Sequence, residues 1–270
     1  MKKILFTDLD DTLLTRDKQL TQQNASSIRR LLDEGHYFAA STGRPLPATL
    51  PLLRSLGLDR PGCFAVTYNG GLIYDVSQNK VLFKRSVPLA FVKHIFTEAD
   101  RFGLYCQTYD DETMLCRSFT EETDYYCKKI GMDWKAAPDL PEGLTNAPVK
   151  VLVISLHNRS LLEQYRKSLE PWAKGKISLY YSNDSYLEHV ACNISKGEAV
   201  RFLCRHLNLP CSHAVAAGDA ENDIPMLQAA GIGAAMQNAG EEVKGAADYV
   251  TSADCDHSGI CEVIEKFILF

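Results

Sequence analysis

The sequence predicts an α/β fold in which helices flank a parallel sheet and a second, α+β lobe is inserted into the chain. Short apolar runs, such as residues 4–6 and 213–217, suit strands that are buried on both faces of such a sheet. The runs near both ends of the chain stop at polar clusters that suit a ligand site, whereas from about residue 84 the pattern changes to amphipathic helices and short strands without such a cluster, apart from one acidic turn. We therefore expect one lobe from residues 1–83 and 188–270, which carries the polar clusters, and an inserted lobe from residues 84–187.

The composition is that of a folded protein without affinity for polyanions. Of the 270 residues, 46% are hydrophobic, and the formal net charge of −5 argues against a nucleic-acid partner. No apolar stretch reaches the roughly 20 residues of a membrane helix, and the first apolar run is too short for a signal peptide. The nine cysteines form no CxxC pair and indicate reduced thiols. We expect a cytoplasmic protein that is a monomer or a weak homo-oligomer.

The first predicted strand runs into three carboxylates, Asp8, Asp10 and Asp11. Ligand sites in open α/β sheets lie just beyond the carboxyl ends of the strands. Because a strand alternates its faces, Asp8 and Asp10 can point to the same side. Carboxylates this close repel one another unless a cation holds them ionised, and Mg²⁺ is the simplest such cation. The competing interpretation is an Asp-rich turn that only caps or solvates the chain.

The next two elements repeat this pattern. A helix is predicted over residues 21–34, and a strand over residues 37–40 runs into the sequence STGR. The hydroxyl of Thr42 and the exposed backbone N–H groups around Gly43 suit a phosphate oxygen, and Arg44 adds forked donors. By itself this segment equally fits an ordinary turn with a solvated Arg44.

A third buried strand is predicted over residues 63–67. It is followed by Asn69-Gly70 and a further apolar run, which is typical of a hairpin turn. For Asn69, a role in this turn is slightly favoured over contact with a ligand.

The inserted lobe combines amphipathic helices with short strands. Its acidic stretch at residues 109–112 is interpreted as a solvated hairpin turn rather than a metal site. The helices are predicted over residues 89–102, 121–130 and 161–172, and the strands over residues 104–108, 114–117, 149–155, 177–181 and 186–190.

The second half of the core begins with a helix that carries Lys196 in its first turn. Ser195 is the predicted N-cap, and Glu198 is placed to complete a capping box. Lys196 therefore lies at the positive end of the helix dipole, where a lysine is unfavourable. A residue that breaks a local rule is a candidate for function, although a solvated lysine is an equal alternative.

A second acidic cluster follows the strand over residues 213–217. Asp219, Asn222 and Asp223 are spaced so that their oxygens can face one place as the turn becomes a helix. An acidic first helical turn fits the same spacing, because the dipole favours it. The remaining elements are strands over residues 231–235 and 248–250 and helices over residues 239–245 and 260–267.

The motifs DxDDTLL, STGR, SKGE and GDxxNDxxML, in this order and at this spacing, resemble the haloacid dehalogenase (HAD) superfamily, and more narrowly its Cof-type (class IIB) phosphatases. They span residues 8–223, and the lobe between them is similar to the large inserted cap of that class. One departure is Asp11, where the family usually has Gly; Asp tolerates unusual backbone angles. The resemblance implies a Rossmann-like HAD core and a cap that closes over the site and selects the substrate.

The resemblance also implies the roles of the residues at the four strand ends. Asp8 would attack phosphorus and form an aspartyl-phosphate. Asp10 would protonate the leaving alcohol and then deprotonate the hydrolytic water. Thr42 would hydrogen-bond the phosphoryl group, and Lys196 would neutralise its charge.

The implied cofactor is Mg²⁺, which would bridge Asp8 and a phosphoryl oxygen. Its ligands would be Asp8, the backbone carbonyl of Asp10, and Asp219, with Asn222 and Asp223 in support. Besides Thr42 and Lys196, we expect Gly43, Arg44 and Asn69 to contact the substrate.

The expected activity is hydrolysis of small phosphate esters, such as sugar phosphates, by a Mg²⁺-dependent phosphatase. One alternative is a phosphomutase on the same scaffold, which would have to protect its aspartyl-phosphate from water; no residue pattern marks that. A second is a non-catalytic module that binds a phosphorylated ligand. It predicts a missing nucleophile or acid, and both Asp8 and Asp10 are present.

Overall fold

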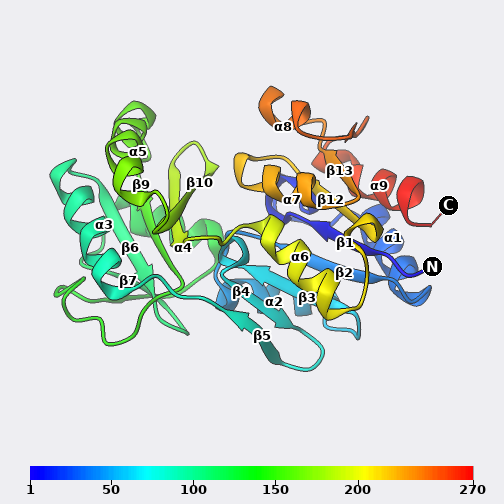
Figure 1. The fold of residues 1–270 in the computed structure, drawn as a ribbon, viewed down its shortest axis with the longest axis horizontal. Helices are drawn as coiled ribbons and strands as arrows, with labels where there is room; N and C mark the ends of the chain where they lie inside the picture. The colour runs from blue at the N-terminus through cyan, green and yellow to red at the C-terminus, as the bar shows by residue number, and fades with distance from the viewer. Residues whose placement is uncertain (270) are drawn as a thin grey trace.

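The computed structural model describes residues 1–269, which form two lobes (Figure 1). One lobe is built on a sheet of eight strands and the other on a sheet of six. The chain enters the second lobe after β5 (Lys80–Lys84) and returns after β11 (Tyr186–Ala191). The predicted α/β architecture is therefore confirmed. No helix in residues 1–269 combines the length and the apolar character needed to span a membrane.

The eight-stranded sheet has the order β14-β13-β12-β1-β2-β3-β4-β5. Its strands pair in parallel from β14 to β3, and β4 and β5 are added antiparallel. Side chains of β1 alternate between two cores, as a strand buried on both faces requires: Leu5 packs on one face, and Ile4 and Phe6 pack on the other. The strands are β1 (Ile4–Thr7), β2 (Tyr37–Ser41), β3 (Cys63–Thr67), β4 (Leu72–Asp75), β5, β12 (Ala214–Gly218), β13 (Ile232–Ala235) and β14 (Tyr249–Val250).

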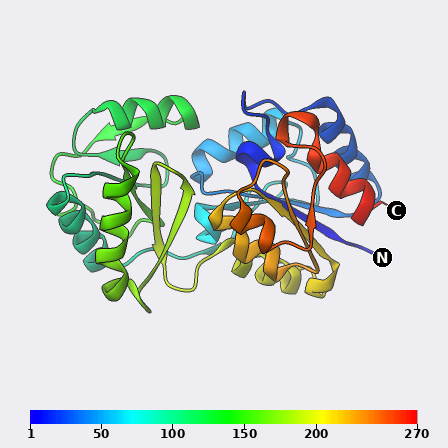
Figure 2. The same ribbon diagram turned by 90° about the horizontal axis from the view of Figure 1, so that it is seen from above.

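Helices cover both faces of this sheet. The face of Leu5 carries three helices, which contribute Ile28, Leu53 and Ile264 to the core. These helices are α1 (Gln22–Asp33), α2 (Leu46–Ser55) and α9 (Gly259–Phe267). The opposite face is covered by α6 (Lys196–His206), α7 (Ile224–Ala229) and α8 (Glu241–Gly245). Figure 2 shows the two sets of helices on either side of the sheet.

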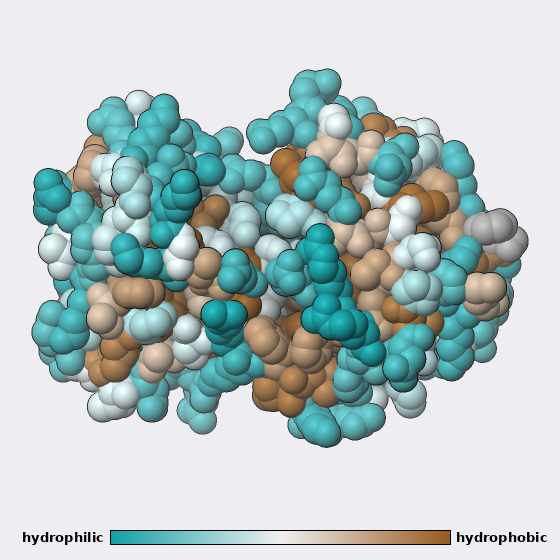
Figure 3. Space-filling view, in the orientation of Figure 1, coloured by the Kyte–Doolittle hydropathy of each residue, from teal (hydrophilic) through white to brown (hydrophobic). Residues whose placement is uncertain are grey.

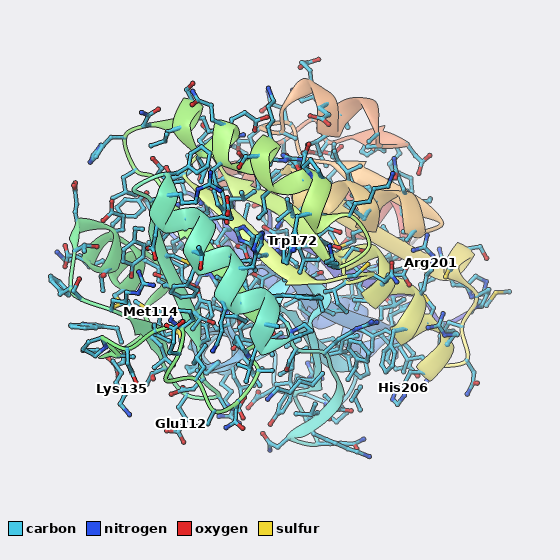
Figure 4. The ribbon with its side chains drawn as sticks, turned by 60° about the vertical axis from the view of Figure 1, so that its left-hand side comes forward. Glu112, Met114, Lys135, Trp172, Arg201 and His206 are labelled. Carbon is cyan, nitrogen blue, oxygen red and sulfur yellow. The ribbon has the colours of Figure 1, made fainter. Side chains whose placement is uncertain are left out.

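The six-stranded sheet has the order β10-β11-β9-β6-β7-β8 and is antiparallel except for the β7–β8 pair. Helices α3 (Leu89–Arg101) and α5 (Arg159–Ala173) pack on one face, where Trp172 lies edge-on against Phe91 at 5.4 Å between ring centroids (Figure 4). Helix α4 (Glu121–Ile130) packs on the other face (Figure 2). The remaining strands are β6 (Tyr105–Tyr109), β7 (Met114–Cys116), β8 (Trp134–Ala136), β9 (Lys150–Ile154) and β10 (Ile177–Asn183).

Two strands and one boundary differ from the sequence prediction. β5 is a largely exposed edge strand whose apolar run, residues 81–83, is flanked by lysines, and β8 has only three residues; neither strand was predicted. The expected boundary between residues 187 and 188 falls inside β11, which pairs wholly within the six-stranded sheet. The hairpin between β6 and β7 matches the prediction, since Asp110 accepts hydrogen bonds from backbone N–H groups of its own turn.

A buried histidine makes the stability of the six-stranded lobe sensitive to acid. His189 on β11 lies 3.0 Å from the hydroxyl of Tyr165 and 3.3 Å from the carbonyl oxygen of Val151. One ring nitrogen donates and the other accepts, which suits a neutral ring. Burial lowers the pKa of His189 to about 3.

We expect His189 to reduce the free energy of unfolding as the pH falls from about 6.5 toward about 3. The unfolded chain binds a proton at the ordinary histidine pKa and the folded chain does not, so stability is lost at up to about 1.4 kcal/mol per pH unit. From about pH 7.5 to about pH 5, the free energy of unfolding measured in urea should fall by about 2 kcal/mol more in the wild type than in His189→Gln. His206→Gln, an exposed ring on α6 (Figure 4), is the control and should behave as the wild type; equal losses in all three proteins would contradict the assignment.

Candidate active site

The carboxyl ends of β1, β2 and β12 lie side by side because these strands are parallel neighbours. The backbone N–H of Asp8 continues the ladder by donating to the carbonyl of Ala217 at 3.0 Å. After Asp8 the chain leaves the strand in a wide turn over residues 9–13, with Asp11 at φ 60°. Asp10 thus reaches the site from a turn. The prediction that strand alternation brings Asp8 and Asp10 to the same side is therefore wrong. Asp11 tolerates the left-handed conformation that glycine would otherwise occupy.

Lys196 is the central cation of the site. Its ammonium donates to Asp8 Oδ1 at 2.5 Å and to Asp223 Oδ1 at 2.6 Å, and its side chain is fully buried. The solvated alternative for this lysine is therefore wrong. Burial would lower the pKa of Lys196, but the two carboxylates outweigh it and raise that pKa above the ordinary lysine value.

The predicted capping box at the start of α6 is only half formed. Ser195 Oγ accepts from the N–H of Glu198 at 3.1 Å, as predicted. The carboxylate of Glu198 does not complete the box, because it pairs with Arg201 at 2.8 Å on the exposed side of the helix.

The second acidic cluster lies beside Asp8. Ligand oxygens of Asp8, Asp219 and Asp223 all come within 4.8 Å of one another. Burial, with the neighbouring carboxylates, raises the pKa of Asp8 to about 7 and that of Asp219 well above its ordinary value. A group of carboxylates that resists ionisation in this way lacks positive charge, which a divalent ion would supply.

The donor set fits a hard cation with oxygen ligands. Among residues 1–269, Asn222 Oδ1 is buried without a hydrogen-bond partner, while its Nδ2 donates to Asn69 Oδ1 at 3.0 Å. Both oxygens of Asp223 are already engaged, Oδ1 by Lys196 and Oδ2 by the N–H groups of Asp219 and Ala220. Asp223 therefore holds the loop that carries Asp219, and it also offers an oxygen close to those of Asp8 and Asp219.

Arg44 is buried against Asp10. Its guanidinium donates from Nε to Oδ2 at 2.7 Å and from Nη2 to Oδ1 at 2.6 Å, so the solvated alternative for Arg44 is also wrong. Lys18, which the sequence motifs do not include, lies 3.1 Å from Asp10 Oδ1. Burial would raise the pKa of Asp10, but the hydrogen bonds and charge of Arg44, with those of Lys18, lower it to about 2.

The predicted phosphate loop and hairpin turn meet at this edge. Thr42 is buried and its Oγ1 accepts from the N–H of Arg44 at 3.1 Å. Gly43 faces the other lobe closely: a Cβ there would lie 2.7 Å from Glu188 Oε1, so a larger residue would displace that carboxylate. Asn69 adopts φ 57° in the turn between β3 and β4, and its side chain also contacts Asn222, so it serves both the turn and the site.

The six-stranded lobe closes the other side of the site, and its contributions were not predicted. Lys150 Nζ donates to the carbonyl of Gly43 at 2.6 Å and lies 2.7 Å from Glu188 Oε2, all three being buried or half-buried. The resulting cleft holds about 580 Å³ including its open mouth, and the molecule is visibly hollowed between its lobes (Figure 3). Its lining from this lobe is Tyr126, Lys129, Ile130, Lys150, Ser182, Asn183, Tyr186 and Glu188.

Comparison with known proteins places this architecture in one family. Residues 5–264 match the family of haloacid dehalogenase-like hydrolases. The chain is 27% identical to a Bacillus subtilis protein named 5-amino-6-(5-phospho-D-ribitylamino)uracil phosphatase, over 99% of this chain and 96% of that protein. It is 27% identical, with a TM-score of 0.88 and full coverage of both chains, to a haloacid dehalogenase-like hydrolase from Bacteroides thetaiotaomicron.

A further solved structure, the subclass IIB sugar phosphatase BT4131, shares the fold with a TM-score of 0.86 at 23% identity over the whole of both chains. These matches confirm the resemblance seen in the four sequence motifs. The chain belongs to the haloacid dehalogenase-like hydrolases, and its relatives include proteins named phosphatases.

Proposed function

We propose that the enzyme hydrolyses phosphate monoesters of small metabolites, such as sugar phosphates, through an aspartyl-phosphate on Asp8 and with Mg²⁺ as cofactor. The observation that supports the proposal is the position of the Asp8 carboxylate. It lines the cleft, and one of its oxygens accepts a hydrogen bond from the Lys196 ammonium. A nucleophile for phosphorus has to be positioned in this way while an adjacent cation screens its charge from the anionic ester.

The residues around Asp8 would support the two halves of the reaction. Asp8 attacks phosphorus, and Lys196 neutralises charge that develops on the phosphoryl oxygens. The hydroxyl of Thr42 and the backbone around Gly43 hold the phosphoryl group. Asp8, Asp219 and Asn222 would hold Mg²⁺, with the backbone carbonyl of Asp10 and support from Asp223. A bound ion would supply positive charge against the repulsion between the anionic nucleophile and the anionic ester.

Asp10 can act as the acid only if its contact with Arg44 changes. At a pKa of about 2, its carboxyl carries no proton near neutral pH. The forked donors of Arg44 suit a phosphate as well as a carboxylate, so an incoming ester competes with Asp10 for them. Release of Arg44 would remove the largest effect that lowers the pKa of Asp10. Burial, which raises that pKa, would then favour the protonated carboxyl that donates to the leaving alcohol and afterwards, as the carboxylate, accepts a proton from water.

The size of the cleft and the names of the relatives support small metabolites as the substrate class. The cleft is of the size that holds small ligands and not macromolecules. One relative is named for a phosphoribitylamino compound, and a protein of the same fold is named a sugar phosphatase. We propose that the six-stranded lobe, including β11, is the cap that encloses the leaving alcohol.

Hydrolysis of p-nitrophenyl phosphate tests the proposal. We expect turnover in the presence of Mg²⁺, loss of at least about 100-fold of it after removal of divalent ions with EDTA, and recovery when Mg²⁺ is restored, since the ion supplies several kcal/mol of charge stabilisation. Turnover that is equal with and without the chelator would contradict the metal dependence. The absence of turnover above an Asp8→Asn control would favour a binding module.

A further inference from the structure

In the part of the chain that the structure describes, two polar groups of the cap line the cleft without a polar partner of their own: the hydroxyl of Tyr186 and the ammonium of Lys129. Tyr186 on β11 is buried, and its hydroxyl has no hydrogen-bond partner among residues 1–269. Two neighbouring groups of the same wall do have partners: the hydroxyl of Tyr126 accepts from Tyr109 at 2.7 Å, and Glu188 accepts from Ser182 at 2.8 Å and pairs with Lys150. A buried hydroxyl without a partner costs free energy unless something else bonds to it.

The second unused group is the ammonium of Lys129 on α4. It lies 5.4 Å from the centre of the Tyr186 ring and 5.7 Å from that of Tyr125, and it lines the cleft. Within residues 1–269 no carboxylate forms an ion pair with it. The two other basic residues that line the cleft are neutralised, Arg44 by Asp10 and Lys150 by Glu188.

The position of these groups identifies which part of a substrate they would meet. The phosphoryl group is held on the core side, at Asp8 and Lys196, so the alcohol portion extends toward the cap. Lys129 and Tyr186 would then face its far end, with one positive charge and one hydroxyl donor to offer. An anionic oxygen satisfies both at once.

We propose that Lys129 and Tyr186 form a subsite for the leaving group, and that it selects phosphate esters of polyols that carry a second anionic group at the far end. Ser182 and Asn183, which line the same wall, supply hydroxyl and amide groups for the polyol. The inference rests on the proposed function, since it assumes that the phosphoryl group is transferred at Asp8. The second anion is a carboxylate or a phosphate, and the two are separated by experiment.

The first test compares matched esters on the wild-type enzyme with Mg²⁺. The carboxylate arm pairs 3-phosphoglycerate with glycerol 3-phosphate and 6-phosphogluconate with glucitol 6-phosphate; the phosphate arm pairs fructose 1,6-bisphosphate with fructose 6-phosphate. We expect kcat/KM to favour the doubly anionic member of at least one pair by about tenfold or more, the usual worth of a hydrogen bond to a charged group. No preference in any pair overturns the inference. If p-nitrophenyl phosphate is still hydrolysed with Mg²⁺, the proposed function survives that outcome.

The second test assigns the preference to the two residues. Lys129→Gln and Tyr186→Phe should each reduce the ratio of kcat/KM between the members of the preferred pair, by about tenfold for the lysine and by less for the hydroxyl. Lys128→Gln is the matched control, because Lys128 precedes Lys129 on α4 but is exposed and pairs with Asp124 at 2.6 Å; its ratio should equal that of the wild type.

Lys129→Arg, which keeps the charge, should keep most of the preference. If Lys129→Gln slows both members of a pair equally, the lysine acts on the transferred phosphoryl group or on folding, and the subsite is refuted. Thermal unfolding of each variant tells those two apart.

Discussion

Replacement of Asp8 by Asn is expected to lower kcat by about 10⁴-fold or more, because the amide cannot attack phosphorus and no other carboxylate occupies its place. Asn has nearly the same shape, and its Oδ1 can accept the hydrogen bond that Lys196 donates at 2.5 Å. The cleft therefore keeps its geometry, and the loss should appear in kcat on p-nitrophenyl phosphate with little change in substrate binding. Mass spectrometry of the acid-quenched wild type should detect the phosphorylated protein, and that of Asp8→Asn should not.

The same substitution should not weaken the fold. Burial and the nearby carboxylates raise the pKa of Asp8 to about 7, so its charge reduces stability as the pH rises from about 4 to about 7. Without metal, Asp8→Asn should therefore unfold at a temperature no lower than the wild type. Asp11→Asn is the control, since Asp11 lies in the same turn but is partly exposed and pairs with Lys18; its kcat should stay within about tenfold of the wild type. Comparable kcat in Asp8→Asn and the wild type would remove the nucleophile assignment.

The position of the site was predictable from the sequence because it depends on topology. Parallel strands bring their carboxyl ends to one edge, so clusters after β1, β2 and β12 had to meet whatever their side chains do. The unfavourable place of Lys196 in a helix dipole likewise pointed to function. The structure adds a reason for it, two carboxylates within 2.6 Å of its ammonium.

The pairing of side chains within the site was not predictable. Arg44 and Asp10 are 34 residues apart, and Asn69 and Asn222 are 153 apart, so their contacts depend on rotamers that no spacing encodes. The residues that the six-stranded lobe contributes to the cleft are still harder to predict. Lys129, Asn183 and Tyr186 come from a helix and two strands, and nothing in their local sequence distinguishes the residue that faces the cleft from its exposed neighbour Lys128.

Removal of Lys196 should reduce turnover and stability together, and Mg²⁺ should offset part of the second effect. For turnover, Lys196→Ala is expected to cost about 3 kcal/mol in kcat/KM, or roughly 100-fold, as for other preorganised groups that stabilise charge in the transition state. For stability, the change leaves the buried carboxylates of Asp8 and Asp223 without their cation, and breaking a buried pair in this way typically costs about 3–5 kcal/mol.

The metal dependence of the stability loss distinguishes this electrostatic role from simple loss of packing. Lys196→Met keeps most of the volume of the lysine side chain and removes only its charge, so a packing role predicts little loss in that variant. An electrostatic role predicts that Lys196→Met unfolds at a lower temperature than the wild type and that the gap narrows when Mg²⁺ is added, because the ion binds the same carboxylates. Lys128→Met, at an exposed position, should show neither effect. A loss of less than about tenfold in kcat/KM for Lys196→Ala, with a gap that Mg²⁺ does not change, would leave the lysine without a catalytic role.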